Sequence, residues 1–397
     1  MKPILIVGAG LAGYTVAREL RKLNKAVPIM IVTADNGGFY SKPMLSNAFA
    51  QGKTAAQLAS HDVEKMAQQL NAVILVNTHV LAIDSGNKTI KTDTGLVQYD
   101  KLVLAVGAAP IRLKLAGDAA DSVISVNHLE HYRTFRDKLD AKRGPSRIAI
   151  LGAGLIGCEF ADDLAGAGHD VTLIDPQALP LAAIAPRDVG NALAEALVQR
   201  GVSLRLGSSA VEINHVRGEF DLCLGNGDII AADLVLSAVG LRPDLQLARQ
   251  AGLATDRGIV VDTFGQTSAP DIYALGDCAQ YCDDNGLSTT LPYIAPLMSA
   301  ARAIAQTLAG APTAIDLKAA PVIVKTPSCP IALVPAPMYA RDAGSWHGTK
   351  QGNQILNRFY DQDGVMLGFA VTQQDAKLRQ QLLAELGTSG GNRLHAA

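Results

Sequence analysis

The sequence predicts an α/β protein in which two similar βαβ units precede a small α+β domain. Two copies of one glycine pattern carry this prediction: residues 8–13 (GAGLAG) follow the apolar run 4–7, and residues 152–157 (GAGLIG) follow the apolar run 148–151. Each copy reads as a buried strand, a glycine turn and the start of a helix. A change of texture near Pro321, to Pro-rich strands and a final helix, predicts the third domain.

The glycine spacing in both copies predicts binding of a dinucleotide. The first glycine makes the tight turn, the second lets backbone approach a pyrophosphate, and the third packs helix against strand. The helix N-terminus then faces the negative charge. In the second copy Asp175 ends the next strand, 18 residues after Gly157, where an acid can accept a hydrogen bond from a ribose hydroxyl. Two such sites suggest hydride transfer from a nicotinamide to a flavin.

Composition excludes several other classes of protein. The chain has 397 residues, of which 48% are hydrophobic, so it can build two or three domains with ample core. A net charge of −2 gives no reason to expect nucleic acid or an anionic membrane as partner. Five scattered cysteines indicate reduced thiols. No run reaches transmembrane length, and the apolar start runs directly into a glycine turn, so we expect no signal peptide and a cytoplasmic location.

Hydrophobic periodicity and turn residues place the elements and the domains. We expect helices at about 13–23, 127–143, 186–200, 296–309 and 373–386, and strands at 28–32, 72–76, 102–106, 171–174, 202–206, 233–240 and 272–275. Residues 361–364 predict a turn, and 388–397 a flexible tail. The first domain is expected to comprise 1–112 and 240–318, the second 113–239, and the third 319–397.

Two further motifs make the chain resemble the glutathione-reductase-like pyridine nucleotide:flavin oxidoreductases over almost its whole length. Residues 105–110 (AVGAAP) are similar to the family's ATGxxP turn, and residues 267–277 (TSAPDIYALGD) to its TxxPxIYAxGD flavin signature. The resemblance implies two Rossmann-like dinucleotide-binding domains, with FAD in the first and NADH in the second. It also implies that Asp277 binds the ribityl chain of FAD.

A third segment indicates the subfamily. Residues 40–46 (YSKPMLS) resemble the Tyr-x-Arg/Lys-Pro-x-Leu-Ser element of rubredoxin and ferredoxin reductases, and no cysteine precedes Cys158 to form a flavin-adjacent disulfide. The length and short third domain resemble the rubredoxin reductases most. This resemblance implies hydride transfer from NADH to FAD and single-electron transfer to rubredoxin. Ferredoxin, flavorubredoxin or oxygen as acceptor stays open, as does a slow redox-sensing or scaffold flavoprotein.

The resemblance also implies roles for individual residues. Lys42 and Glu159 are the expected catalytic residues: Lys42 would stabilise the reduced, anionic flavin, and Glu159 would sit between flavin and nicotinamide. Either Asp35 or the backbone at Thr33 would hold the FAD adenosine ribose. The expected FAD-binding residues are Gly8, Ala9, Gly10, Leu11, Ala12, Gly13, Thr33, Ala34, Asp35, Lys42, Pro43, Val80, Gly107, Glu159, Asp277, Ile294 and Lys325. The expected NADH-binding residues are Gly152, Gly154, Gly157, Asp175 and Gly240.

Two remaining patterns concern metals and the partner. Cys278 and Cys282 are spaced C-x₃-C, but no histidine lies between positions 216 and 346, so we interpret them as structural thiols and expect no metal. Residues 321–397 hold seven Lys or Arg against five Asp or Glu, whereas the other 320 residues hold 28 against 32. A more basic third domain predicts a small acidic electron carrier as partner, with rubredoxin preferred. The alternative, that the small excess has no role, stays open.

Overall fold

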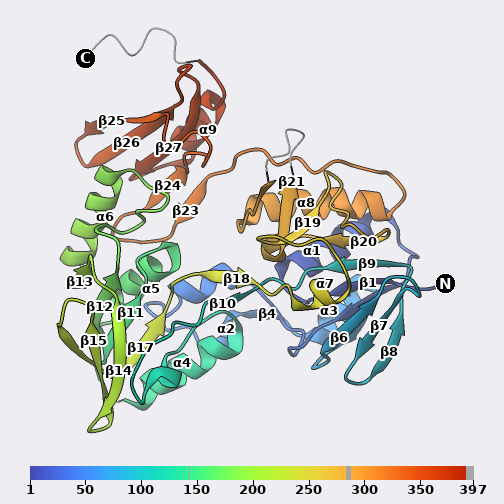
Figure 1. Ribbon diagram of the computed structural model, residues 1–397, viewed down its shortest axis with the longest axis horizontal. Helices are drawn as coiled ribbons and strands as arrows, with labels where there is room; N and C mark the ends of the chain where they lie inside the picture. Colours follow the sequence, from blue (N-terminus) through green and yellow to red (C-terminus); the bar gives the residue numbers. More distant parts are fainter. Residues whose placement is uncertain (143, 283–287, 390–397) are drawn as a thin grey trace. The chain divides into compact units, whose positions relative to one another are not determined.

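The computed structural model describes residues 1–142, 144–282 and 288–389. The chain divides into two compact units, each assembled from three segments of sequence. The first unit comprises residues 1–42, 56–109 and 241–318, and the second comprises 43–55, 110–240 and 319–397. Figure 1 shows the elements of both units along the chain.

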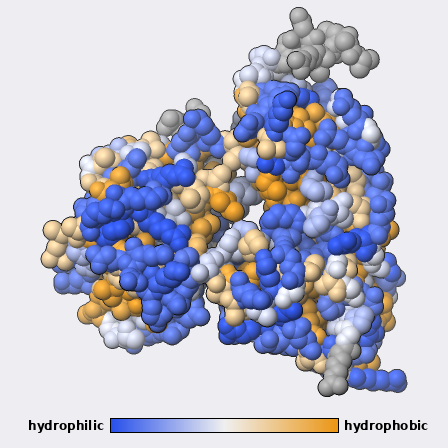
Figure 2. Space-filling view, turned by 180° about the vertical axis from the view of Figure 1, so that it is seen from behind, coloured by the Kyte–Doolittle hydropathy of each residue, from blue (hydrophilic) through white to orange (hydrophobic). Residues whose placement is uncertain are grey.

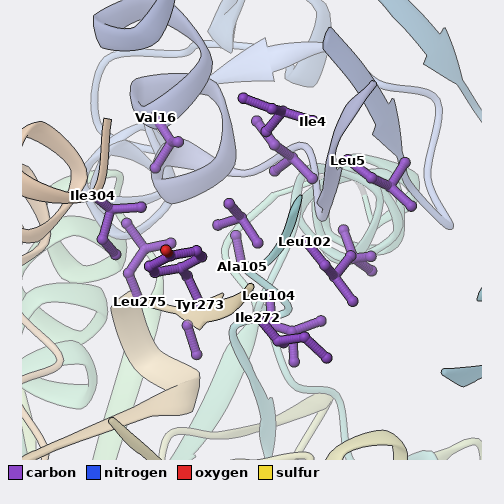
Figure 3. Packing of buried hydrophobic residues seen from close by; sticks show 14 of the residues in the cluster. Ile4, Leu5, Val16, Leu102, Leu104, Ala105, Ile272, Tyr273, Leu275 and Ile304 are labelled. Atoms are coloured by element: carbon purple, nitrogen blue, oxygen red, sulfur yellow. The ribbon is translucent and has the colours of Figure 1, made fainter. Parts of the chain in front are cut away.

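The first unit is built on a five-stranded parallel sheet. Its strand order is β20-β9-β1-β2-β5, and the strands are β1 (Ile4–Val7), β2 (Ile29–Val32), β5 (Val73–Leu75), β9 (Lys101–Leu104) and β20 (Ile272–Ala274). The helices of this unit include α1 (Leu11–Leu23), α3 (Val63–Leu70), α7 (Gln246–Gln250) and α8 (Ile294–Leu308). Helix and sheet residues form one core, in which Val16 of α1 and Ile304 of α8 join residues of β1, β9 and β20 (Figure 3). Continuous apolar strands such as β1 are expected where helices cover a parallel sheet.

Shorter elements complete the first unit. Three small sheets are formed by β6 (Val80–Asp84), β7 (Thr89–Thr92) and β8 (Gly95–Gln98); by β19 (Ile259–Val261), β21 (Ala279–Cys282) and β22 (Ser288–Thr289); and by β3 (Phe39–Tyr40) and β4 (Ala59–His61). A 3₁₀ helix, η3, spans Gly276–Cys278. The chain passes from one unit to the other within η1 (Lys42–Asn47), α2 (Ala55–Leu58) and β10 (Ala108–Pro110), the last of which pairs with β18 (Leu241–Pro243).

The second unit contains a four-stranded parallel sheet of order β13-β12-β11-β17. Its strands are β11 (Arg147–Leu151), β12 (Asp170–Asp175), β13 (Ser203–Leu206) and β17 (Leu234–Ser237), and its helices are η2 (Ala120–Ser122), α4 (Leu129–Ala141), α5 (Leu155–Gly166) and α6 (Arg187–Gln199). An antiparallel sheet of β14 (Ala210–Val216), β15 (Glu219–Leu224) and β16 (Ile229–Ala232) follows β13. β11 therefore repeats, in this unit, the position that β1 has in the first.

The C-terminal part of the second unit is a five-stranded antiparallel sheet with one helix. The strand order is β23-β24-β27-β26-β25, with β23 (Val322–Val324), β24 (Ile331–Val334), β25 (Ser345–Gln351), β26 (Gln354–Tyr360) and β27 (Met366–Thr372), followed by α9 (Ala376–Glu385). Leu382 of α9 is buried with Phe369 and Val371 of β27, so the helix covers one face of the sheet.

The predicted fold class is confirmed: the chain has two βαβ units with parallel sheets and a C-terminal α+β part. The predicted helices and strands are all present, with ends that differ by a few residues. The predicted turn at 361–364 is also present, because Asp361 Oδ1 accepts hydrogen bonds from the backbone of Asp363 and Val365. The tail prediction is wrong for its first two residues. The carbonyl oxygen of Thr388 accepts a hydrogen bond from Met366, and Ser389 pairs with Val365; residues 390–397 lie outside the described part.

On the face that Figure 2 draws, hydrophobic residues appear in separate patches between hydrophilic ones. Among the described residues no helix is both long enough and apolar enough to cross a bilayer.

Candidate active site

The first glycine turn connects β1 to α1 in the first unit. Gly8 has a φ of +110°, and a Cβ added there would collide with the carbonyl oxygen of Ala105 at the end of β9. A Cβ on Gly13 would collide with the carbonyl oxygen of Gly8. A Cβ on Gly10, by contrast, would meet nothing within 4 Å. Protein packing therefore requires the first and third glycines, whereas the second faces open space.

The second glycine turn, between β11 and α5 in the second unit, repeats this geometry. Gly152 has a φ of +102°, and its added Cβ would lie 2.7 Å from the carbonyl oxygen of Ala238. An added Cβ on Gly157 would collide with the carbonyl oxygen of Gly152, and one on Gly154 would meet nothing within 4 Å. In both units the second glycine caps the following helix without a side-chain hydrogen bond. The first N–H groups of each helix can therefore face a phosphate.

The acids at the end of the second strand of each βαβ unit, or shortly after it, accept hydrogen bonds from the backbone. Asp175 Oδ2 accepts a hydrogen bond from the N–H of Ala153 at 2.6 Å, inside the second glycine turn, and Oδ1 accepts from Gln177 at 2.7 Å. Asp35 Oδ1 accepts from the Thr33 hydroxyl at 2.7 Å and from the N–H of Gly37 at 2.9 Å. Asp175, which lies 18 residues after Gly157, therefore holds the backbone of the second glycine turn.

The flavin-signature segment lies against the first glycine turn. A Cβ added to Gly276 of η3 would lie 3.2 Å from Ala12 of α1 and 3.6 Å from Leu297 of α8. Asp277 follows directly in η3. Burial lowers the pKa of the Lys42 ammonium, and the negative charge of Asp277 opposes that shift. Within the described residues no protein group accepts a hydrogen bond from the Lys42 ammonium, which is partly buried.

The other expected cofactor residues have the following positions. Val80 begins β6, Ile294 is the exposed first residue of α8, and Gly107 has a φ of +69° with open space beside it. Ala34 is exposed. The carbonyl oxygen of Gly240 accepts a hydrogen bond from Ile111 at 3.1 Å in the second unit.

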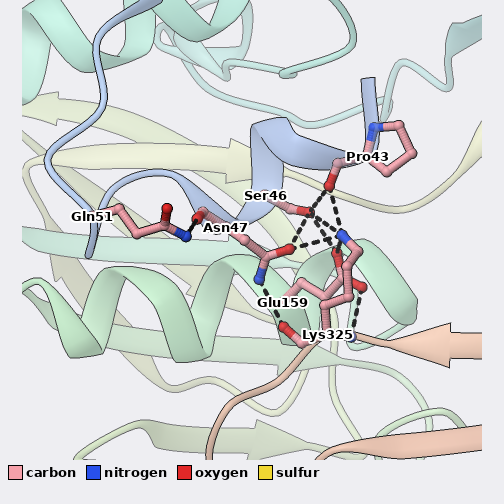
Figure 4. Close-up of polar contacts among 6 residues, drawn as sticks. All are labelled: Pro43, Ser46, Asn47, Gln51, Glu159 and Lys325. Atoms are coloured by element: carbon pink, nitrogen blue, oxygen red, sulfur yellow. Dashed lines mark hydrogen bonds and ion pairs between the residues drawn. The ribbon is translucent and has the colours of Figure 1, made fainter. Parts of the chain in front are cut away.

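Glu159 and Lys325 form an ion pair within the second unit (Figure 4). Lys325 Nζ lies 2.8 Å from Glu159 Oε2, and the side chain of Glu159 is only 3% exposed. The backbone N–H of Lys325 also donates to Glu159 Oε1 at 2.9 Å, and the Ser46 hydroxyl donates to Glu159 Oε2. The Lys325 ammonium donates further to Asn47 Oδ1 at 2.7 Å and to the carbonyl oxygen of Pro43 at 2.5 Å. The buried carboxylate is therefore paired and fully hydrogen-bonded, as a buried charge requires.

Helix α5 holds two further buried carboxylates that the sequence analysis did not select. Asp163 accepts hydrogen bonds from the backbone of Phe49 and Ala50, and Asp162 accepts one from Ser328 at 3.0 Å. Burial raises the pKa of the Asp163 carboxyl, and the hydrogen bond from Phe49 opposes that shift. A signal for these residues does exist in the sequence, since acids rarely occur within a helix as apolar as residues 155–166.

All five cysteines are free thiols. Cys278 is buried and donates its S–H to the carbonyl oxygen of Leu275, whereas Cys282 contacts the Ser288 hydroxyl at 3.1 Å. No cluster of three or more His, Cys, Asp or Glu side chains in the described ranges could hold a metal ion. The C-x₃-C spacing thus belongs to two side chains with separate partners.

The residues present fit two dinucleotides. In each unit the second glycine leaves room that no atom of the described residues fills, at a helix start without a side-chain cap hydrogen bond. The half-buried cation Lys42 and the carboxylate of Asp277 in the first unit fit a group with phosphates and hydroxyls, such as FAD. Asp175 and the second turn fit the ribose and pyrophosphate of a nicotinamide dinucleotide.

Comparisons with known proteins agree with this geometry. The family model described as Pyridine nucleotide-disulphide oxidoreductase matches residues 2–307, and the one described as Rubredoxin binding C-terminal domain matches residues 314–386. The chain therefore belongs to the pyridine nucleotide-disulphide oxidoreductase family, as the sequence motifs predicted, and its C-terminal part matches a rubredoxin-binding domain.

Curated relatives and a solved structure are similar over almost the whole chain. Rubredoxin-NAD(+) reductase of Alcanivorax borkumensis is 43% identical over 387 residues, which cover 97% of this chain and 99% of that protein. The protein of the same name from Acinetobacter baylyi is 41% identical over 392 residues, covering 97% and 98%. The covalent putidaredoxin reductase–putidaredoxin complex superposes with a TM-score of 0.87 at 26% identity, covering 98% of this chain and 94% of that one.

Proposed function

We propose that the protein is an FAD-dependent NADH:rubredoxin reductase. The observation that carries this proposal is the pair of glycine turns, one in each unit, whose second glycine faces open space at a helix start. The names of the two curated relatives and the match of residues 314–386 support rubredoxin as the electron acceptor. FAD, when bound, accepts an electron pair as a hydride and returns electrons one at a time.

We further propose three domains. Residues 1–112 and 240–318 bind FAD, residues 113–239 bind NADH, and residues 319–397 form the C-terminal domain. The interrupted order of the first domain is supported by the parallel sheet of the first unit, in which β20 pairs with β9 across that interruption.

FAD is assigned to the first glycine turn and to the residues that the family resemblance implies. Asp35 is preferred over the Thr33 backbone for the adenosine ribose. The N–H and carbonyl groups of Thr33 are both used, toward Leu75 and Thr78, whereas Asp35 Oδ2 accepts no hydrogen bond from a described residue. The other proposed contacts are Ala34, Lys42, Pro43, Val80, Gly107, Glu159, Asp277, Ile294 and Lys325.

NADH is assigned to the second glycine turn, Asp175 and Gly240. Lys42 supplies positive charge where the reduced flavin gathers negative charge, which favours the reduced state. Asp175 accepts from a ribose hydroxyl but would repel the additional phosphate of NADPH. The location is assigned to the cytoplasm, where the five thiols stay reduced.

The decisive experiment compares electron acceptors. NADH oxidation by the FAD-loaded protein is measured with rubredoxin, ferredoxin and oxygen, and rubredoxin should be reduced fastest. The positive balance of residues 321–397 should speed encounter with an acidic carrier, so the rate should fall as salt rises from about 0.01 to 0.5 M. If salt does not change the rate, charge steering is refuted but the reductase function is not. If rubredoxin is not reduced, the electron acceptor must instead be ferredoxin, flavorubredoxin or oxygen.

A further inference from the structure

Asn47 is the last residue of η1 and the residue that follows the predicted YSKPMLS element. Its side-chain amide contacts Lys325 twice, across 278 positions of sequence (Figure 4). Asn47 Nδ2 donates to the carbonyl oxygen of Lys325 at 2.7 Å, and Asn47 Oδ1 accepts from the Lys325 ammonium at 2.7 Å. One amide thus holds both the backbone and the charged end of the same residue.

These contacts complete the hydrogen bonding of the Lys325 ammonium. A lysine ammonium has three N–H donors, and the three close acceptors around Nζ are Glu159 Oε2, Asn47 Oδ1 and the carbonyl oxygen of Pro43. The Lys325 side chain is 34% exposed, so water can compete for any donor that loses its partner. Loss of the Asn47 acceptor would therefore allow the ammonium to leave Glu159.

We propose that Asn47 is a positioning residue that fixes Lys325 against Glu159. The inference rests on the proposed function only where it assigns this ion pair to flavin chemistry. The Asn47 clamp, meaning the two hydrogen bonds between the Asn47 amide and Lys325, follows from the contacts alone. An amide is suited to this place because it offers a donor and an acceptor together, whereas a carboxylate offers acceptors alone. Asn47 acts through Lys325 and is not itself a catalytic residue.

The clamp is tested by the chemical reactivity of Lys325. The FAD-loaded protein is treated with a limiting amount of acetic anhydride, and acetylation of Lys325 is measured by mass spectrometry against the exposed Lys350 of the same molecule. Asn47→Ala should raise the Lys325-to-Lys350 ratio about tenfold, because a hydrogen bond to a charged group is lost. Asn47→Asp keeps an acceptor for the ammonium and should stay within about threefold of the wild type.

A matched control is available in the same segment. Gln51 donates to the backbone carbonyl of Asn47 at 2.8 Å and is exposed, so Gln51→Ala removes a neighbouring hydrogen bond without touching Lys325. It should leave the acetylation ratio unchanged. An unchanged ratio in Asn47→Ala, or an equal rise in Gln51→Ala, would overturn the clamp. If Asn47→Ala does not fold, Asn47→Ser takes its place, because the short hydroxyl cannot replace both amide contacts.

A second measurement separates the clamp from the reaction. In Asn47→Ala the rate of flavin reduction at saturating NADH should fall about tenfold, while the KM for NADH stays within about twofold, because the dinucleotide contacts are intact. A raised acetylation ratio with an unchanged reduction rate would keep the clamp and refute the role of the ion pair in the reaction. A raised KM with an unchanged rate at saturation would overturn positioning for the reaction.

Discussion

Replacing single glycines by alanine separates the binding role of each turn from its structural role. In the second turn, a methyl group on Gly154 would meet no protein atom within 4 Å, whereas one on Gly157 would collide with the carbonyl oxygen of Gly152. Gly154 is the N-cap of α5, where alanine costs up to about 1 kcal/mol of stability. Gly157→Ala gains about 1 kcal/mol of helix propensity but forces the backbone apart, so it should lose about 1–3 kcal/mol in total.

For NADH affinity we expect a large effect from Gly154→Ala, the variant that should cost less stability. Gly154→Ala places a methyl group where the pyrophosphate is proposed to approach the backbone, so the apparent affinity for NADH should fall by at least about tenfold. Thermal melting gives the stability of each variant, and NADH titration of flavin reduction gives the affinity. Gly10→Ala is the matched control in the first turn, where an added methyl also meets no protein atom within 4 Å. It should lower FAD retention with little change in melting temperature. Unaltered NADH affinity in Gly154→Ala would refute the assignment of that open space to the dinucleotide.

Three other predictions concern single side chains. Asp175→Ala should raise the KM for NADH by about tenfold, measured by steady-state kinetics, and equal use of NADPH by the wild type would contradict the assignment. Replacing Cys278 and Cys282 together with serine should leave NADH-driven electron transfer within a few-fold, because burial raises the pKa of the Cys278 thiol to about 11 and keeps it protonated; loss of activity with FAD still bound would make the pair functional. Burial would raise the pKa of the Asp233 carboxyl, but hydrogen bonds from Arg147 and Lys142 outweigh the effect of burial and hold that pKa well below its usual value. The stability that Asp233 contributes is therefore present above about pH 4 and is lost on acidification. Asp233→Asn should cost about 1–2 kcal/mol at pH 7 and progressively less below pH 4 in urea titrations.

Local sequence patterns predicted the parts of the fold whose signal is local. β1 and residues 148–151 of β11 are continuous apolar runs followed by glycines, so the pattern that predicts each strand and the turn after it lies within neighbouring residues. The antiparallel sheet of β14, β15 and β16 was not predicted. Its strands alternate irregularly between buried and exposed positions, so the pairing partner and not the pattern decides them.

The residues of the candidate site also divide into those that the sequence could select and those that it could not. The glycine turns, Asp175 and Asp277 lie within motifs of fixed spacing and could be selected from sequence. Asn47 could not, because its partner lies 278 residues away and an asparagine after a turn-like segment has many ordinary explanations. The hydrogen bond from the backbone of Ala153 to Asp175 could not be predicted from the sequence either, although the acid itself was predicted.

Helix α5 is the element at which the contacts that the sequence did not predict are concentrated. It begins at the second glycine turn, and within its first nine residues it presents the buried carboxylates Glu159, Asp162 and Asp163. Apolar residues would pack such a helix at less cost, since each buried carboxylate must be desolvated and then matched by donors. Here the donors come from two remote segments, 46–50 and 325–328. A core helix that departs from the local rule in this way indicates a functional requirement. The helix that starts at the second glycine turn also accepts hydrogen bonds from the backbone of Lys325 and Ser328, so the position of that lysine depends on the helix at which NADH binding is proposed.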